Sequence, residues 1–168
     1  MTNDLIKLAV ALKDIKFTMF TTIGEEGNLY SRPMATLEID ERNFDGRIWF
    51  FTDIHSPKVQ NLKTDQHVNL AYAQPNDQKY ISVAGTARIV NDREKMRELW
   101  TTVMKAWFPE GIDDPNIGLI CVEVESAELW DSPPSKVVQL AGMAKAIVTG
   151  KPYDGKKHQH HFDVEGQH

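Results

Sequence analysis

The stretch that decides the fold spans residues 47–62, RIWFFTDIHSPKVQNL. Its first half is rich in aromatic and β-branched residues, which favour a β-strand. Its second half contains Ser56, a good helix N-cap residue, followed by Pro57, which suits the first helical position. The stretch therefore predicts a strand that runs through a short turn directly into a helix.

The predicted start of this helix suits a negatively charged ligand. A helix N-terminus presents unpaired backbone N–H groups and the positive end of the helix dipole, and both favour an anion such as phosphate. Lys58 stands in the first turn, where a cation is unfavourable unless an anion is bound nearby. An ordinary capped helix with a solvated lysine is the other interpretation of the same residues.

Composition indicates one globular domain without nucleic-acid or membrane partners. The chain has 168 residues, of which 41% are hydrophobic and 26% charged, enough to bury a core. A net charge of −5 without a basic cluster argues against nucleic acid as a partner. No apolar run reaches the length of a membrane span, and the first residues lack the basic start of a signal peptide. We therefore expect a cytoplasmic protein.

The single cysteine supports this expectation. Cys121 has no partner for an internal disulfide and lies within the apolar run 119–124. A buried, unreactive thiol is typical of a protein in a reducing compartment.

The remaining pattern predicts a small antiparallel barrel with flanking helices. Strands are expected near residues 17–23, 29–39, 48–51, 68–73, 79–90 and 117–125, and helices near 4–12, 57–62, 91–107 and 135–148. Most connections between consecutive strands are too short for parallel crossovers. Closing six antiparallel strands into a barrel would remove exposed edges, so we expect a mainly β, α+β fold.

The predicted strand 29–39 carries a useful alternation. Arg32 and Met34 fall on one of its faces. Pro33 between them cannot donate to a neighbouring strand, which predicts an edge position or a local irregularity. Backbone groups there would be free to bind something other than a strand.

The chain is expected to form one domain over residues 1–150, followed by a polar and flexible tail over 151–168. Four of the six histidines lie in the tail, including His158, His160 and His161. Such a group can collect a transition metal, but an unanchored terminal segment explains it better, so we assign no metal site.

No catalytic residue emerges from the sequence. It contains no nucleophile elbow, no Walker motif and no dinucleotide fingerprint, and its carboxylates form no recognisable pair. By elimination the chain is a binder of an anionic, partly aromatic ligand, and the reactive chemistry would belong to a cofactor.

Several short motifs together carry a family resemblance. They are Ser31-Arg32-Pro33-Met34, Trp49-Phe50-Phe51-Thr52, Ser56-Pro57-Lys58, Tyr80-Ile81-Ser82-Val83-Ala84-Gly85, Trp107-Phe108-Pro109-Glu110-Gly111 and Glu128-Leu129-Trp130-Asp131. Each is weak alone, but their order over nearly the whole chain resembles the general stress proteins of the pyridoxamine 5′-phosphate oxidase-like superfamily, the FMN-binding split barrels.

The resemblance implies a six-stranded split barrel that forms a homodimer, with an FMN in each of two grooves between the subunits. By this resemblance Arg32, Lys58 and Ser56 would hold the FMN phosphate. The isoalloxazine edge would lie along Met34 and the neighbouring backbone at Pro33, and along Phe51 and Thr52. Tyr80 stands where the oxidases have a cofactor-contacting glutamine. Trp107 could close the flavin site from the partner subunit or pack in the core.

Two departures from the oxidases bear on function. Pro57 replaces the arginine that usually follows the serine, which removes one phosphate contact and would leave room for FAD as well as FMN. The arginine- and histidine-rich C-terminal motif that grips pyridoxine phosphate is absent, so vitamin B6 oxidation is not expected.

Three functions remain open at this point. The first is an FMN-dependent oxidoreductase acting on an unknown small substrate. The alternative is a non-enzymatic stress protein that binds or sequesters flavin. A haem-handling barrel is a third interpretation, in which His55 is the one histidine placed near the groove.

Overall fold

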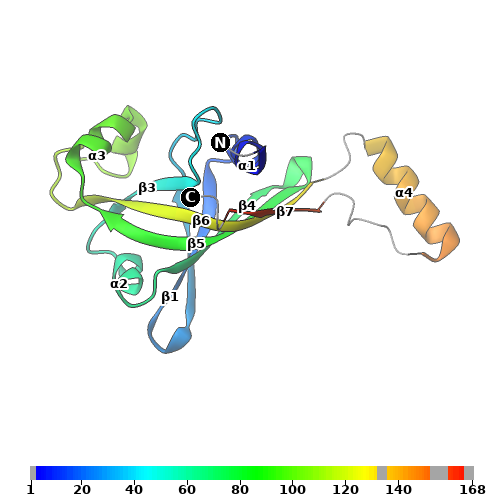
Figure 1. The fold of residues 1–168 in the computed structure, drawn as a ribbon, viewed down its shortest axis with the longest axis horizontal. Coiled ribbons are helices and arrows are strands. Elements are labelled where there is room, and N and C mark those ends of the chain that lie inside the picture. Colours follow the sequence, from blue (N-terminus) through cyan, green and yellow to red (C-terminus); the bar gives the residue numbers. More distant parts are fainter. Residues whose placement is uncertain (1–2, 132–135, 152–158, 165–168) are drawn as a thin grey trace.

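The structure is a computed structural model that describes residues 3–131, 136–151 and 159–164 (Figure 1). The helices are α1 (Asn3–Leu12), α2 (Pro57–Thr64), α3 (Arg93–Leu99) and α4 (Lys136–Thr149). The strands are β1 (Phe17–Ile23), β2 (Leu29–Ala35), β3 (Arg47–Asp53), β4 (His67–Gln74), β5 (Lys79–Val90), β6 (Ile117–Trp130) and β7 (Gln159–Asp163). The 3₁₀ turns are η1 (Glu25–Gly27), η2 (Pro75–Asp77) and η3 (Thr102–Ala106).

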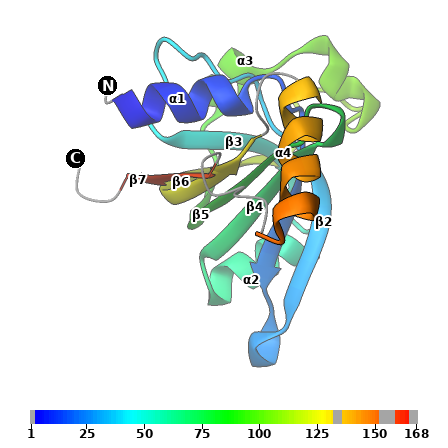
Figure 2. The same cartoon turned by 90° about the vertical axis from the view of Figure 1, so that its right-hand side faces the viewer.

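The strands form one antiparallel sheet in the order β2-β1-β4-β5-β6-β3, with β7 pairing the second half of β6. The two ends of this path meet, because the backbone N–H of Leu37 donates to the carbonyl of Trp49 on β3 (3.0 Å). The sheet thus curls into a split barrel, and α1 and α2 lie toward opposite ends of it (Figures 1 and 2). The predicted antiparallel split barrel with flanking helices is confirmed.

The main core lies inside the curled sheet. Alternate residues of each strand point inward, and the rings of Phe20 and Phe50 meet edge to face with centroids 5.2 Å apart. The apolar stripe of α1, including Leu8 and Leu12, closes this core as its spacing predicted.

A second core covers the outward face of β3 and β6. Phe51 and Leu119 point there, and Met96 of α3 packs over them. The ring of Trp100 meets the ring of Phe51 edge to face at 5.3 Å. Cys121, on β6, is buried as expected, and burial raises the pKa of its thiol.

The helix predicted over residues 91–107 is wrong in its length. The α-helix ends at Leu99, because Trp100 and Thr101 have extended backbone (ψ 131° and 153°), and a 3₁₀ turn follows. The run Thr101-Thr102-Val103 is β-branched throughout, which disfavours helix. The break lets Trp100 reach the second core.

The long pairing of β5 with β6 contains one bulge. The register shifts between Ala84 and Gly85, which pair with Ser126 and Val124 and leave Glu125 between them. A Cβ atom on Gly85 would lie 2.2 Å from the carbonyl oxygen of Glu123. Only glycine therefore permits this close approach of the two strands.

Part of the C-terminal segment differs from the flexible tail that the sequence predicted. Residues 159–163 form β7, which pairs with β6 and buries the side chain of Phe162 to 4% exposure. The side chains of His160 and His161 are exposed on the two faces of strand β7. The alternating apolar pattern here consists of only two buried residues, Phe162 and Val164, which is too short to predict a strand. His158 lies outside the described residues.

No helix among the described residues combines the length and the apolar character that a membrane span requires.

The burial of Phe162 generates a prediction for β7. Phe162→Ala should lower the free energy of unfolding by about 3 kcal/mol, because it removes a large side chain from a closed core. His161→Ala, on the same strand but exposed, should change it by less than about 0.5 kcal/mol. Urea unfolding followed by circular dichroism measures both; equal, small effects would contradict the docking of β7.

Candidate functional site

Arg32 is held at one end of the barrel by strand β1. The register pairs Arg32 with Phe20, and its guanidinium Nη1 donates to Thr22 Oγ1 (2.7 Å) and to the carbonyl of Phe20 (3.3 Å). Asn61 on α2 donates to the same Thr22 hydroxyl oxygen (3.0 Å). Strand β2, strand β1 and helix α2 are thereby tied together at Thr22.

Lys58 lies at the start of α2, close enough to Arg32 for the two charges to repel. Burial lowers the pKa of Lys58, and the positive charge of Arg32 lowers it further, while the Asp53 carboxylate acts in the opposite direction. Burial also lowers the pKa of Arg32. Two partly buried cations in mutual repulsion would be stabilised by an anion between them.

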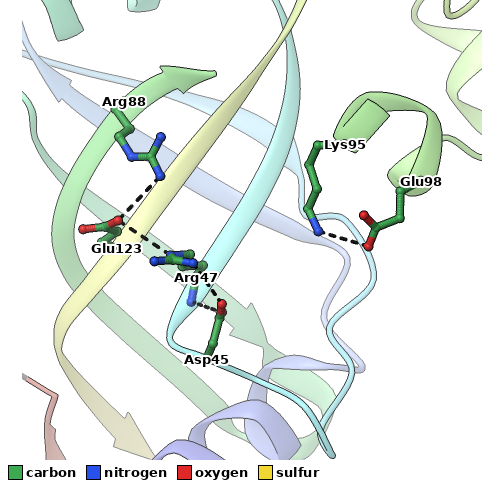
Figure 3. Close-up of polar contacts among 6 residues, drawn as sticks. All are labelled: Asp45, Arg47, Arg88, Lys95, Glu98 and Glu123. Atoms are coloured by element: carbon green, nitrogen blue, oxygen red, sulfur yellow. Dashed lines mark hydrogen bonds and ion pairs between the residues drawn. The ribbon is translucent and has the colours of Figure 1, made fainter. Parts of the chain in front are cut away.

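Three cations elsewhere in the chain are arranged differently. On the outer side of the barrel, Arg47 and Arg88 both approach Glu123 Oε1 (3.7 Å each), and Lys95 pairs with Glu98 (3.0 Å) (Figure 3). These exposed pairs satisfy their own charges. Arg32 and Lys58, by contrast, form no ion pair with any carboxylate in residues 3–131, 136–151 and 159–164.

The start of α2 has no side-chain cap. Pro57 is the first helical residue, as predicted, and the backbone of Ser56 is extended (φ −67°, ψ 153°). The Ser56 side chain makes no capping hydrogen bond to the helix; its Oγ lies 3.5 Å from Thr52 Oγ1. The structure thus disfavours the ordinary capped helix with a solvated lysine and leaves a hydroxyl beside the two cations.

The other predicted site residues are divided between two faces of the sheet. Met34 and Thr52 are buried on the inner side of the barrel, the side of Arg32. Pro33 is exposed on the opposite side of β2. The side chain of Phe51 points into the second core, which leaves only its backbone for a ligand at the barrel end.

Tyr80 and Trp107 do not join this group within one chain. Tyr80 is exposed on the outward face of β5, beside Trp130 of β6. Trp107 is 52% exposed, with its ring centroid 6.4 Å from that of Phe17, so it does not pack in the core. One chain therefore assembles Arg32, Thr52, Ser56 and Lys58.

Two residues that support the site were missed by the sequence analysis. Thr22 follows Phe20 on the inward side of β1, and the strand alternation could have placed it beside a residue of the paired strand. Asn61 lies one turn after Lys58 on α2, on the same side of the helix. Nothing in the sequence alone indicated that Asn61 and Arg32 would both donate to the Thr22 hydroxyl oxygen.

The described residues contain no group of three histidine, cysteine or acidic side chains that could hold a metal ion. His55, the residue considered for haem, is exposed and its Nε2 lies 3.2 Å from Asn116 Oδ1. The arrangement at the start of α2 is suited to binding an anion rather than to acid–base catalysis.

Comparison with known proteins places this geometry in a family. The model of the family described as pyridoxamine 5′-phosphate oxidase like matches residues 3–154. Protein bli-3 of Neurospora crassa is 34% identical over 146 residues, which cover 82% of this chain and 69% of that protein. General stress protein 26 of Bacillus subtilis is 32% identical over 89 residues, which cover 52% of this chain and 63% of that protein.

A solved structure agrees with these sequence matches. The general stress FMN/FAD binding protein from Xanthomonas citri superposes with a TM-score of 0.67 at 28% identity, covering 80% of this chain and 93% of that one. The fold, the motifs and the family match coincide, and this chain belongs to the pyridoxamine 5′-phosphate oxidase-like family.

Proposed function

We propose that this protein binds a flavin nucleotide, FMN in the first instance, with the phosphate held by Arg32, Lys58 and Ser56. The observation that carries the proposal is the pair of partly buried cations, without an ion-paired carboxylate, at a helix start that has no side-chain cap. Arginine supplies a planar fork for phosphate oxygens, and lysine supplies a point charge. The naming of the Xanthomonas citri relative as an FMN/FAD binding protein supports a flavin and keeps FAD as the second candidate.

The rest of the flavin would extend from the phosphate along β2 toward Met34 and the backbone of Pro33. A strand advances about 3.3 Å per residue, so Ala35 lies about 10 Å from Arg32 along this direction. Thr52 and the backbone of Phe51 border the same end of the barrel from β3. The protein's contribution would be to anchor the phosphate, orient the ring and exclude water from one of its faces.

We further propose a homodimer with the flavin at its interface. The outward face of the sheet exposes large apolar side chains from several strands, including Phe17, Met19, Tyr80 and Trp130. Exposed apolar groups of this kind are typical of an interface between subunits. Pairing two copies through this face would bring Tyr80 of one copy toward the flavin of the other, and Trp107, which contacts Phe17 near the end of β2 of its own chain, would take part in the same interface.

Within this frame the function we favour is a flavin-dependent oxidoreductase that acts on a small substrate, in the cytoplasm. A bound flavin supplies hydride and electron transfer, so the chain needs no acid–base pair of its own. The alternative is a protein that binds or sequesters flavin without turnover. The observation in its favour is that the residues assembled at the site, Arg32, Thr52, Ser56 and Lys58, include no carboxylate or histidine to handle a substrate proton.

The phosphate anchor can be tested by substitution. Arg32→Ala and Lys58→Ala should each weaken FMN binding by about 1.5–3 kcal/mol, roughly tenfold to hundredfold, because each removes a charge-assisted hydrogen bond. Fluorescence titration with FMN measures the change.

Two controls make this test specific. Riboflavin, which lacks the phosphate, should bind both variants as it binds the unmodified protein. Lys63→Ala removes a lysine from the other end of α2, where it bonds Gln60, and should leave FMN affinity unchanged. Equal losses for FMN and riboflavin, or no loss for either variant, would refute the phosphate site.

The lowered pKa of Lys58 predicts a pH dependence of binding. A bound phosphate favours the charged lysine and so raises its pKa, which means that binding takes up a proton once the free lysine begins to titrate. FMN affinity should therefore fall as the pH rises from neutrality toward the ordinary lysine pKa of about 10.4. Lys58→Arg, which stays charged, should show no such fall; parallel pH profiles for the two proteins would contradict the assignment.

A reduction experiment separates the oxidoreductase from the sequestering protein. The protein loaded with FMN and kept free of oxygen is mixed with NADH or NADPH, and dithionite serves as the positive control. Loss of visible flavin absorption with a nicotinamide, faster than for free FMN, is the result expected of an oxidoreductase. Reduction by dithionite alone would favour the sequestering function.

A further inference from the structure

We propose that helix α4 of one copy seats in an apolar groove of a second copy, beside the flavin site. The groove is defined by the end of α1 and the start of β1, by the end of β2, and by the segment around η3. This inference rests on the homodimer proposed above and adds what each copy contributes to the other.

Helix α4 carries an apolar stripe exposed to solvent. Leu140, Met143 and Ile147 recur at steps of three and four residues and therefore share one side of the helix. Their exposed fractions are 66%, 49% and 83%. An isolated helix of this length, 14 residues, is marginal in water and gains most of its stability by packing an apolar side. The stripe therefore requires a covering surface.

The groove offers such a surface on the same chain. It has a volume of about 480 Å³, and its apolar walls include Leu12, Phe17, Leu99, Met104 and Trp107. Val103, which also lines the groove, is 65% exposed, and Phe17 and Trp107 are each 52% exposed. A helix with anchors at positions i, i+3 and i+7 is a common occupant of grooves of this kind.

The helix and the groove of one chain do not meet. Figure 1 shows α4 at one end of the longest axis of the molecule and α3, which leads into η3, at the other. The nearest way to satisfy both surfaces is reciprocal exchange about a two-fold axis, in which each copy gives its helix and receives the other's. Each copy has one groove and one stripe, so in a dimer every groove and every stripe can be covered.

Charge supports a protein occupant. Residues 136–151 contain three lysines and no acidic residue, while the whole chain carries a net charge of −5. The rest of the chain is therefore more acidic than the whole and attracts a basic helix from a second copy, while the groove lining itself is balanced, with Glu38 and Glu98 beside Lys13 and Lys16. Lys145 lies on the side of α4 away from the stripe and would stay in solvent. Membrane-surface helices usually have more basic and aromatic residues than α4.

The seated helix would complete the flavin site. The groove is lined by Ala35 and Thr36, which follow Met34 directly along the chain. A partner helix there would wall the end of the flavin ring that the chain's own residues leave open. The copy that binds the phosphate and the copy that covers the ring would thus be different.

Disulfide trapping tests the exchange without depending on activity. In the double variant Val103→Cys/Ile147→Cys, mild oxidation at low protein concentration should convert most of the protein into a covalent dimer on a non-reducing gel. The native Cys121 is buried and does not interfere. The matched control is Val103→Cys/Lys145→Cys, whose helix cysteine faces away from the groove and should give at least tenfold less dimer.

The remaining outcomes are distinct. A faster-migrating monomer would show that α4 seats in its own groove, and equal, low dimer yields for both double variants would show that it seats in neither; both overturn the proposal. Sedimentation velocity and FMN titration on the same preparations separate these results from failure of the homodimer or of the flavin site. Co-flotation of the unmodified protein with anionic phospholipid vesicles, lost in Ile147→Lys and without trapping, would assign α4 to membranes instead and also overturn it.

Discussion

The architecture depends on closure of the antiparallel sheet. Once the chain leaves β2, the Leu37 N–H bonds the Trp49 carbonyl, and the two ends of the strand order come together. This closure sets β2, which carries Arg32, and β3, which leads through a tight turn into α2 and Lys58, at the same end of the barrel. The proposed anion site would therefore be a consequence of topology: Arg32 and Lys58, 26 positions apart, come near each other because a barrel must join its edge strands.

The sequence predicted the parts of this arrangement that depend on local patterns. The shared face of Arg32 and Met34 on β2, the helix near residues 4–12 and the Ser56-Pro57 start of α2 follow from side-chain period and backbone preference, and each lies where expected. The helix after β5 ended early because tertiary packing of Trp100 on Phe51 added to a weak β-branched run. Strand β7 escaped prediction because pairing with β6, rather than its own composition, holds it. The surroundings of Arg32 were predictable only in part: its partner Thr22 lies on the neighbouring strand of the same hairpin, whereas Asn61, which donates to the same Thr22 hydroxyl oxygen, comes from α2 and meets it only in the folded chain.

The charged groups of the protein illustrate why position matters more than number. Arg47, Arg88 and Glu123 satisfy one another at the surface, where water screens them and their pairing has little energetic effect. Arg32 and Lys58 are fewer, but they are partly removed from water and face no carboxylate that pairs with them. Their mutual repulsion is unfavourable in the folded chain, and an anion bound between them would relieve it, so the same repulsion would increase the affinity of the proposed site.

A flavin needs a polar anchor for its phosphate and an apolar wall for its ring, and the residues suited to these two tasks lie in different parts of the protein. The polar anchor is built within one chain, from β1, β2 and α2, whereas the exposed aromatic residues that could cover a ring, Tyr80 and Trp107, lie on outward surfaces. In the proposed homodimer, cofactor binding and subunit association would share the same apolar surfaces, and linkage requires that each strengthen the other. On this proposal a monomer would keep its affinity for the phosphate but lose the wall around the ring, so that assembly would turn the anion site into a flavin site.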